Sequence, residues 1–126
     1  CHTARGGEPL AGGRALPTPF GSVFSTNLTP HATGLAGWSA DDFWRALHLG
    51  QSRDGRLLVP AHPIGNTTLI NRTDANALHA WLQAQPAVAA PRRTHELHWP
   101  MNTELGRQLA VAAWRVLFFR PGVYQP

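Results

Sequence analysis

The chain opens on Cys1-His2, and farther along it reads Val59-Pro60-Ala61-His62-Pro63-Ile64. Two prolines bracket the Ala-His pair of the second stretch, and because proline fixes its own φ angle they restrict the positions that His62 can take. Residues 3 to 37 are rich in glycine and proline and have no helical period. A loop of this length is uncommon in a compact domain unless it has a function. Together these features predict a chain that wraps a large, flat, apolar group.

Cys1-His2 matches the second half of Cys-x-x-Cys-His, the signature through which a haem is attached covalently and receives an axial ligand. The first cysteine and the two spacer residues of that signature are not part of this sequence. We therefore expect the chain to begin inside its own cofactor site. Taken alone, a Cys-His pair is weak evidence, and the rest of the sequence decides its meaning.

Further motifs follow in a fixed order along nearly the whole chain. They are Gly6-Gly7, Gly12-Gly13, Thr18-Pro19-Phe20-Gly21, Ser25-Thr26-Asn27-Leu28-Thr29-Pro30, Gly37-Trp38-Ser39, Asp42-Phe43, Asp54-Gly55, Trp114 and Phe118-Phe119. In combination they resemble the first haem domain of the cytochrome c subunit of membrane-bound bacterial alcohol and gluconate dehydrogenases. The resemblance implies an all-α fold of class I cytochrome c type, with three helices and long loops around haem c and with the N-terminal helix missing. Residues 1–126 would then be a single cytochrome c domain and a piece of a longer multihaem chain.

The resemblance also implies how the iron of haem c is held. His2 is expected to be the proximal ligand, and Cys1 is expected to form one thioether bond to the haem. His62 stands where the family has a methionine, so we predict it as the distal ligand, with a position near the iron but unbound, or in solvent, as the alternatives. Because methionine ligation raises the haem potential, a histidine here predicts a lower one. Met101 is expected to be a core or surface residue rather than a ligand.

Two further residues are candidates for contacts with the haem propionates. Trp38 is predicted to donate its indole N–H to a propionate, and a core tryptophan with its N–H on a carbonyl is an equal alternative. Arg14 is a candidate ion-pair partner for a propionate. His95 and His98, with His79, form a weaker pattern for zinc, because zinc sites commonly use four closely paired ligands.

Helical patterning is clear in three stretches. They cover about residues 39–49, 74–83 and 103–119. Ser39 is a good N-cap for the first and Gly50 is placed to end it, and Thr73 is expected to cap the second. No run of residues predicts a β-strand.

The leading functional prediction is electron transfer. The resemblance implies that electrons pass from a dehydrogenase catalytic subunit, through this and further haem domains, to membrane ubiquinone. It also implies a periplasmic location, with membrane association left open. No paired carboxylates or Ser/His/Asp arrangement stand out, so we do not expect an enzyme. A haem-based sensor or small-ligand-binding domain is the alternative, and a haem-free helical module is a third.

Charge and hydropathy exclude two other classes. All eleven basic residues are arginine, the formal net charge is +4, and only Arg92-Arg93 are adjacent. Nucleic-acid binding proteins show a clustered basic stripe or a known motif, so no nucleic acid partner is expected. No apolar run reaches the roughly 18 residues that a membrane span needs.

Overall fold

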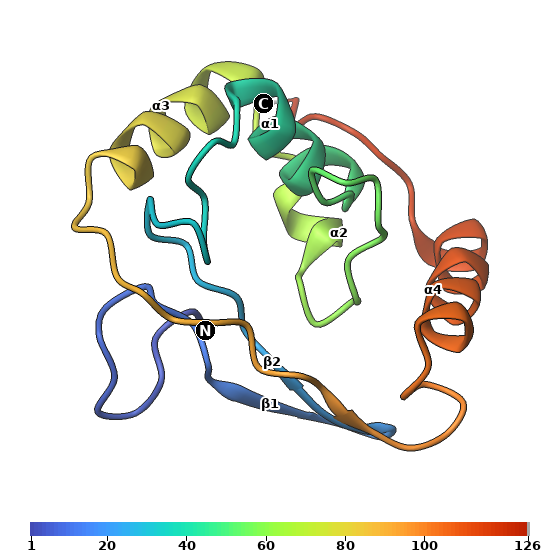
Figure 1. The fold of residues 1–126 in the computed structure, drawn as a ribbon. Coiled ribbons are helices and arrows are strands. Elements are labelled where there is room, and N and C mark those ends of the chain that lie inside the picture. Colours follow the sequence, from blue (N-terminus) through green and yellow to red (C-terminus); the bar gives the residue numbers. More distant parts are fainter. Residues whose placement is uncertain (126) are drawn as a thin grey trace. The chain divides into compact units, whose positions relative to one another are not determined.

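Among residues 1–125, which this computed structural model describes, the chain forms four helices and three strands (Figure 1). In chain order they are β1 (Ala15–Thr18), β2 (Gly21–Phe24), α1 (Ala40–Leu49), α2 (Ile64–Thr67), α3 (Arg72–Gln83), β3 (Glu96–Leu97) and α4 (Glu104–Phe118). The chain divides into two compact units. The first holds Cys1–Gly37 and Ala80–Asn102, and the second holds Trp38–His79 and the segment from Thr103 onward.

The sheet of the first unit shows that the predicted all-α fold is wrong. Its strands are antiparallel in the order β1-β2-β3 (Figure 1). They have four, four and two residues. Pro17 has no N–H to donate to a neighbouring strand. It is tolerated in β1 because β1 lies at the edge of the sheet, where one side has no neighbouring strand to bond. Strands this short do not show the alternation by which a strand is recognised in a sequence, and β3 comes from a distant part of the chain.

A tight turn and one glycine hold this sheet together. Pro19-Phe20 connects β1 to β2, and the Thr18 hydroxyl donates to the Gly21 oxygen over 2.7 Å. Gly21 has a φ of 120°, and a Cβ there would lie 2.2 Å from the Glu96 main-chain oxygen. Only glycine therefore lets β3 approach β2 this closely.

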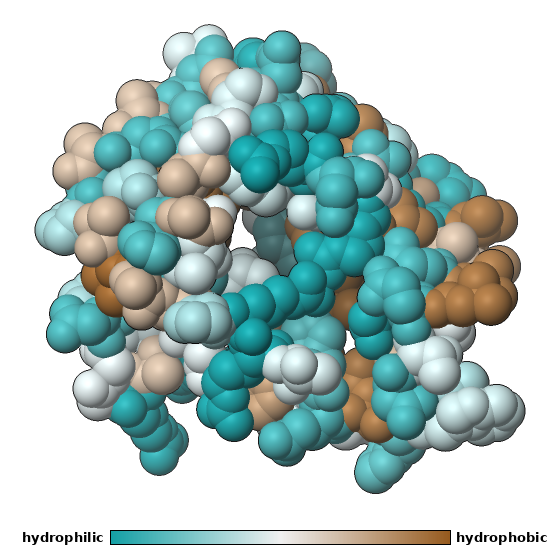
Figure 2. All heavy atoms as spheres, in the orientation of Figure 1, coloured by the Kyte–Doolittle hydropathy of each residue, from teal (hydrophilic) through white to brown (hydrophobic). Residues whose placement is uncertain are grey.

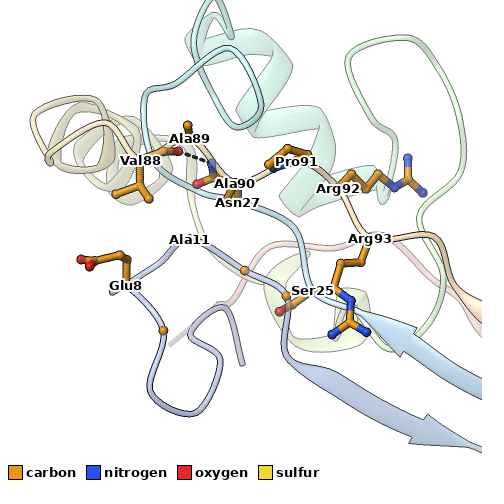
Figure 3. Close-up of a pocket in the computed structure, with 13 residues that line it drawn as sticks. Glu8, Ala11, Ser25, Asn27, Val88, Ala89, Ala90, Pro91, Arg92 and Arg93 are labelled. Carbon is orange, nitrogen blue, oxygen red and sulfur yellow. Dashed lines mark hydrogen bonds between the residues drawn. The ribbon is translucent and has the colours of Figure 1, made fainter.

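The long loop of the first unit is ordered around the buried amide of Asn27. Its Oδ1 accepts from the Thr29 main-chain N–H and hydroxyl, at 2.9 and 2.7 Å. Its Nδ2 donates to the Thr33 hydroxyl at 3.1 Å and to the Val88 carbonyl at 2.8 Å, the bond drawn in Figure 3. Four bonds satisfy the whole amide. Asn27 thus fixes a loop that has no helical structure and joins it to the segment around residue 88.

In the second unit, α1 confirms the first predicted helix. The Ser39 hydroxyl accepts from the Asp42 N–H, and the Asp42 carboxylate accepts from the Ser39 N–H, each over 3.0 Å. This capping box satisfies two N-terminal donors, and the hydrogen bond from the Ser39 main chain lowers the pKa of Asp42. At the other end, Gly50 adopts a φ of 65° and closes the helix.

α2 is tied to the last turn of α1 through two threonines. The Thr67 and Thr68 hydroxyls donate to the carbonyl oxygens of Leu47 and His48, both over 2.8 Å. Those carbonyls lie in the last turn of α1, where the helix has no further N–H groups to bond to them. The segment that carries His62 therefore continues directly into an element anchored on α1.

α3 and α4 confirm the other two predicted helices, with changes at their ends. α3 begins at Arg72, and the Asn71 side chain accepts from the Asp74 N–H over 2.8 Å. The predicted cap at Thr73 is therefore wrong, because Asn71 supplies the acceptor instead. α4 follows Thr103, whose hydroxyl accepts from Gly106 over 3.1 Å.

α4 leaves a largely apolar face exposed. Figure 2 shows hydrophobic side chains at the surface over this helix. The most exposed of them are Leu105, Leu109, Val116, Leu117 and Phe118. Among the described residues, neither α4 nor any other helix combines the length and the hydropathy of a membrane span.

Candidate functional site

The His2 ring is held by one nitrogen and leaves the other open. It is half-buried, and its Nδ1 lies 2.8 Å from the main-chain oxygen of Thr26. Because a carbonyl only accepts, Nδ1 carries the hydrogen and Nε2 keeps a lone pair. Nε2 has no hydrogen-bond partner among the described residues. A ring held through one N–H to a carbonyl, with the other nitrogen open, is the arrangement of a metal-ligating histidine.

Gly12 brings the Thr26 peptide to this position. The Gly12 N–H donates to the His2 oxygen over 2.8 Å, and the next residue, Gly13, donates to Ser25 over 2.8 Å. Gly12 has a φ of 76°, and a Cβ on it would lie 2.4 Å from the Thr26 carbonyl carbon. Only glycine fits. The sequence shows Gly12-Gly13 as a motif, but no pattern in it identifies Gly12 or Thr26 as supports of His2.

Cys1 and Arg14 both lie at the surface of the first unit. Cys1 is exposed with a free thiol. Arg14 pairs with Ser25 through its main chain, which donates to the Ser25 hydroxyl and accepts from the Ser25 N–H, each over 3.0 Å. The exposed Arg14 guanidinium has no ion pair or hydrogen bond with any described residue. Both predicted site residues are thus accessible to a cofactor.

Trp38, in the second unit, interacts through its main chain. Its carbonyl oxygen lies 2.9 Å from the His79 Nε2, and the His79 ring packs against Phe43 at 5.5 Å between centroids. The Trp38 side chain is half-buried, and its indole N–H has no partner in the described part of the chain. The alternative of an indole donating to a protein carbonyl is therefore not what the structure shows.

His62 is held differently from His2. It is half-buried, and its Nε2 lies 3.4 Å from the Thr67 hydroxyl oxygen. That hydroxyl gives its own hydrogen to Leu47, so it accepts from Nε2. A separation of 3.4 Å is longer than the usual 2.7–3.2 Å range and marks a weak bond. The contact with Thr67 therefore holds the His62 ring only weakly at Nε2.

The remaining histidines are not gathered with other ligand-type residues in residues 1–125. No cluster of three or more His, Cys, Asp or Glu that could hold a metal ion occurs in residues 1–125. The His95 Nδ1 accepts from the Phe24 main-chain N–H over 3.1 Å. His95 thus has a structural role beside β2.

The first unit also contains an open cleft of about 280 Å³ (Figure 3). Glycines and alanines from the loop form one side, and Val88 to Arg93 form the other. Arg92 and Arg93 lie at one end of the view, and Glu8 points outward at the other. The cleft is thus basic at the end nearest Ser25.

A histidine with one open ring nitrogen, directly after an accessible cysteine, fits the class of c-type cytochromes. Comparison with known proteins supports the same class. The chain is 42% identical over 127 residues to a nicotinate dehydrogenase subunit of Pseudomonas putida, covering all of this chain and 10% of that protein. It is 36% identical over 120 residues to the gluconate 2-dehydrogenase cytochrome c subunit of Pantoea cypripedii, covering 94% and 26%.

A third relative is the alcohol dehydrogenase (quinone) cytochrome c subunit of Gluconobacter oxydans, 32% identical over 128 residues, with 98% of this chain and 26% of that protein covered. No protein-family model matches the chain. Two of these relatives are named as cytochrome c subunits of dehydrogenases and match nearly the whole chain, so the resemblance seen in its motifs is confirmed. The chain spans between a tenth and about a quarter of the length of these three relatives.

Proposed function

We propose that this chain is an electron-transfer domain that holds a covalently bound haem c and does not itself turn over a substrate. The observation that carries the proposal is the His2 ring, with Nδ1 bound to Thr26 and Nε2 open. The names of its relatives, cytochrome c subunits of gluconate and alcohol dehydrogenases, support it. When bound, haem supplies an iron that takes up and releases one electron.

The residues around Cys1-His2 fit such a group. The exposed Cys1 thiol is accessible for a thioether bond. The His2 Nε2 lone pair is a ligand for iron, and the hydrogen bond from Nδ1 to Thr26 orients the ring. Gly12 keeps the Thr26 carbonyl in place. This part of the chain therefore attaches and orients the cofactor.

The remaining site residues belong to the same proposal. His62 is proposed as the second axial ligand, from its place in the sequence and from the weakness of its bond to Thr67. Trp38 and Arg14 are proposed to interact with the propionates, since neither the indole N–H nor the guanidinium has a partner among the described residues. With two histidines, the potential is lower than with histidine and methionine.

The proposed partners follow from the relatives. We propose that electrons arrive from a dehydrogenase catalytic subunit and leave, through further haem domains, toward ubiquinone in the respiratory chain. On this proposal, residues 1–126 form one periplasmic cytochrome domain at or near a membrane.

A visible spectrum with a pyridine haemochrome assay tests the proposal. We expect a c-type haemochrome and a low-spin reduced spectrum that carbon monoxide does not change. Absence of covalent haem would overturn the proposal. A spectrum that changes with carbon monoxide would instead favour a sensor or small-ligand-binding domain, because His62 would then not hold the sixth position.

A further inference from the structure

The Arg93 guanidinium lies over an aromatic ring and has no counter-ion among residues 1–125. Its guanidinium lies 4.0 Å from the centre of the Phe24 ring, and Phe24 is buried. The ion pairs found among residues 1–125 involve other arginines. Arg93 has neither an ion pair nor a hydrogen bond with a described residue. Stacking on an aromatic ring orients the planar guanidinium, so less entropy is lost when it binds a partner.

The Ser25 hydroxyl of the neighbouring loop lies at the same end of the cleft as Arg93. A Cβ on Gly13 would lie 4.0 Å from the Arg93 Cδ, so the arginine stem passes over Gly13. Gly13 in turn donates its main-chain N–H to Ser25. The Ser25 hydroxyl accepts from the Arg14 N–H, and its own hydrogen has no acceptor in the described chain. Figure 3 shows Ser25 and Arg93 at the same end of the cleft.

This end of the cleft offers donors to an anion. Arg92 also lines it, and Glu8 is the carboxylate of the lining. Glu8 points away from Arg93 in Figure 3 and lies at the opposite end. A planar guanidinium with an adjacent hydroxyl suits a carboxylate, which accepts two parallel N–H bonds from arginine.

Ser25 and Gly13 are neighbours in sequence of the two residues that hold His2. Ser25 directly precedes Thr26, whose carbonyl binds the His2 Nδ1, and Gly13 directly follows Gly12, which binds the His2 oxygen. We propose that Arg93, together with the Ser25 hydroxyl, binds a carboxylate, and that in the haem-loaded protein this carboxylate is a haem propionate. The proposal rests on the proposed function, and it adds Arg93 and Ser25, which no motif of the sequence singles out for this role.

The test is the haem reduction potential of the haem-loaded protein and its variants. Arg93→Gln removes a positive charge from the cofactor, which favours the oxidised, more positive haem. At a fixed potential we expect the ratio of oxidised to reduced haem to rise about threefold to tenfold. This is the size expected for one unit charge near a redox centre when the effective dielectric constant is about 20. Arg93→Lys keeps the charge and should recover most of the shift. Arg5→Gln, which removes a charge from a solvent-exposed turn of the same unit, should change the ratio much less, because solvent screens an exposed charge.

Two outcomes would overturn the proposal. If Arg93→Gln and Arg5→Gln give the same ratio while Arg14→Gln gives the shift, the propionate lies at Arg14. If Arg93→Gln leaves the potential unchanged but slows electron uptake from the dehydrogenase partner and weakens its salt dependence, the carboxylate belongs to the partner protein. The wild-type haemochrome keeps these outcomes separate from failure of the proposed function, because without haem no potential is measured. Should Arg93→Gln fold poorly, Ser25→Ala gives a second variant, with a smaller shift in the same direction expected.

Discussion

His2 and His62 are held in opposite ways. His2 donates from Nδ1 to a main-chain carbonyl over 2.8 Å, so the nitrogen that projects from the far side of the ring is open. His62 has its Nε2 3.4 Å from a threonine hydroxyl, so the nitrogen that would bind a metal already has a weak partner. If both rings bind iron as proposed, the first already has an open nitrogen, whereas the second must give up its contact with Thr67.

Among the tests of this comparison, His2→Ala is expected to have the largest effect. We expect loss of the low-spin haem spectrum, because the proposed proximal ligand is removed while Cys1 remains. Absorbance spectroscopy of the reduced protein measures the loss. His98→Ala is the control, since His98 is exposed and is not part of the site. A low-spin spectrum that survives in His2→Ala would contradict the role of His2.

Gly12→Ala tests how tightly Gly12 packs against the Thr26 peptide that holds His2. The added Cβ would lie 2.4 Å from the Thr26 carbonyl carbon, and the residue has a φ of 76°. We expect the free energy of unfolding to fall by about 2–4 kcal/mol, from the clash and the strained backbone together. Urea denaturation measures it.

Gly6→Ala is a matched control for that change. Gly6 has a φ of 70° in the same unit, but a Cβ on it meets no atom within 4 Å. Only the strain of a positive φ applies, about 1 kcal/mol. Equal effects of the two substitutions would show that the contact with Thr26 is not tight.

His62→Met tests the second histidine of the comparison, by asking whether His62 binds the iron. If His62 is the distal ligand, methionine should raise the haem potential by on the order of 100 mV, because axial ligands set potentials over a range of about 0.8 V. Redox titration followed by absorbance measures the change, and the weak sulfur-to-iron band near the red edge of the oxidised spectrum should appear. An unchanged potential would mean that His62 does not bind iron.

Thr67→Val gives the smallest expected effect. It removes the bond to Leu47 and the weak acceptor of His62. We expect a loss of about 0.5–1.5 kcal/mol in the free energy of unfolding, measured by urea denaturation, and no change in the haem spectrum. A large spectral change would show that Thr67 orients His62 in the loaded protein.

Local signals in the sequence predicted three of the four helices found in residues 1–125, and the short α2 was not predicted. Ser39 and Gly50 mark the ends of α1 through contacts within a few residues, and both have the predicted roles. α3 begins two residues before its predicted start because Asn71, not Thr73, supplies the cap. Errors of this size arise where two good caps compete within one turn.

The sheet and the support of His2 could not be predicted in the same way. β3 pairs with β2 across more than seventy residues of sequence, and neither strand is long enough to show alternation. Cys1-His2 was recognisable as a motif, but Thr26 acts through its main-chain oxygen and Gly12 through a missing side chain. A main-chain acceptor or a missing side chain leaves no residue pattern in a single sequence, so such contacts cannot be predicted from it.

The buried amide of Asn27 has a consequence for the order in which the chain folds. One of its bonds reaches Val88, 61 positions away. Contacts that are distant in sequence form slowly, because the chain between them must be closed first. The loop around Asn27, with its neighbour Thr26, therefore reaches its final form only after the segment around residue 88 has folded back against it. His2, although it precedes nearly all of these residues in the sequence, belongs to one of the last parts to mature.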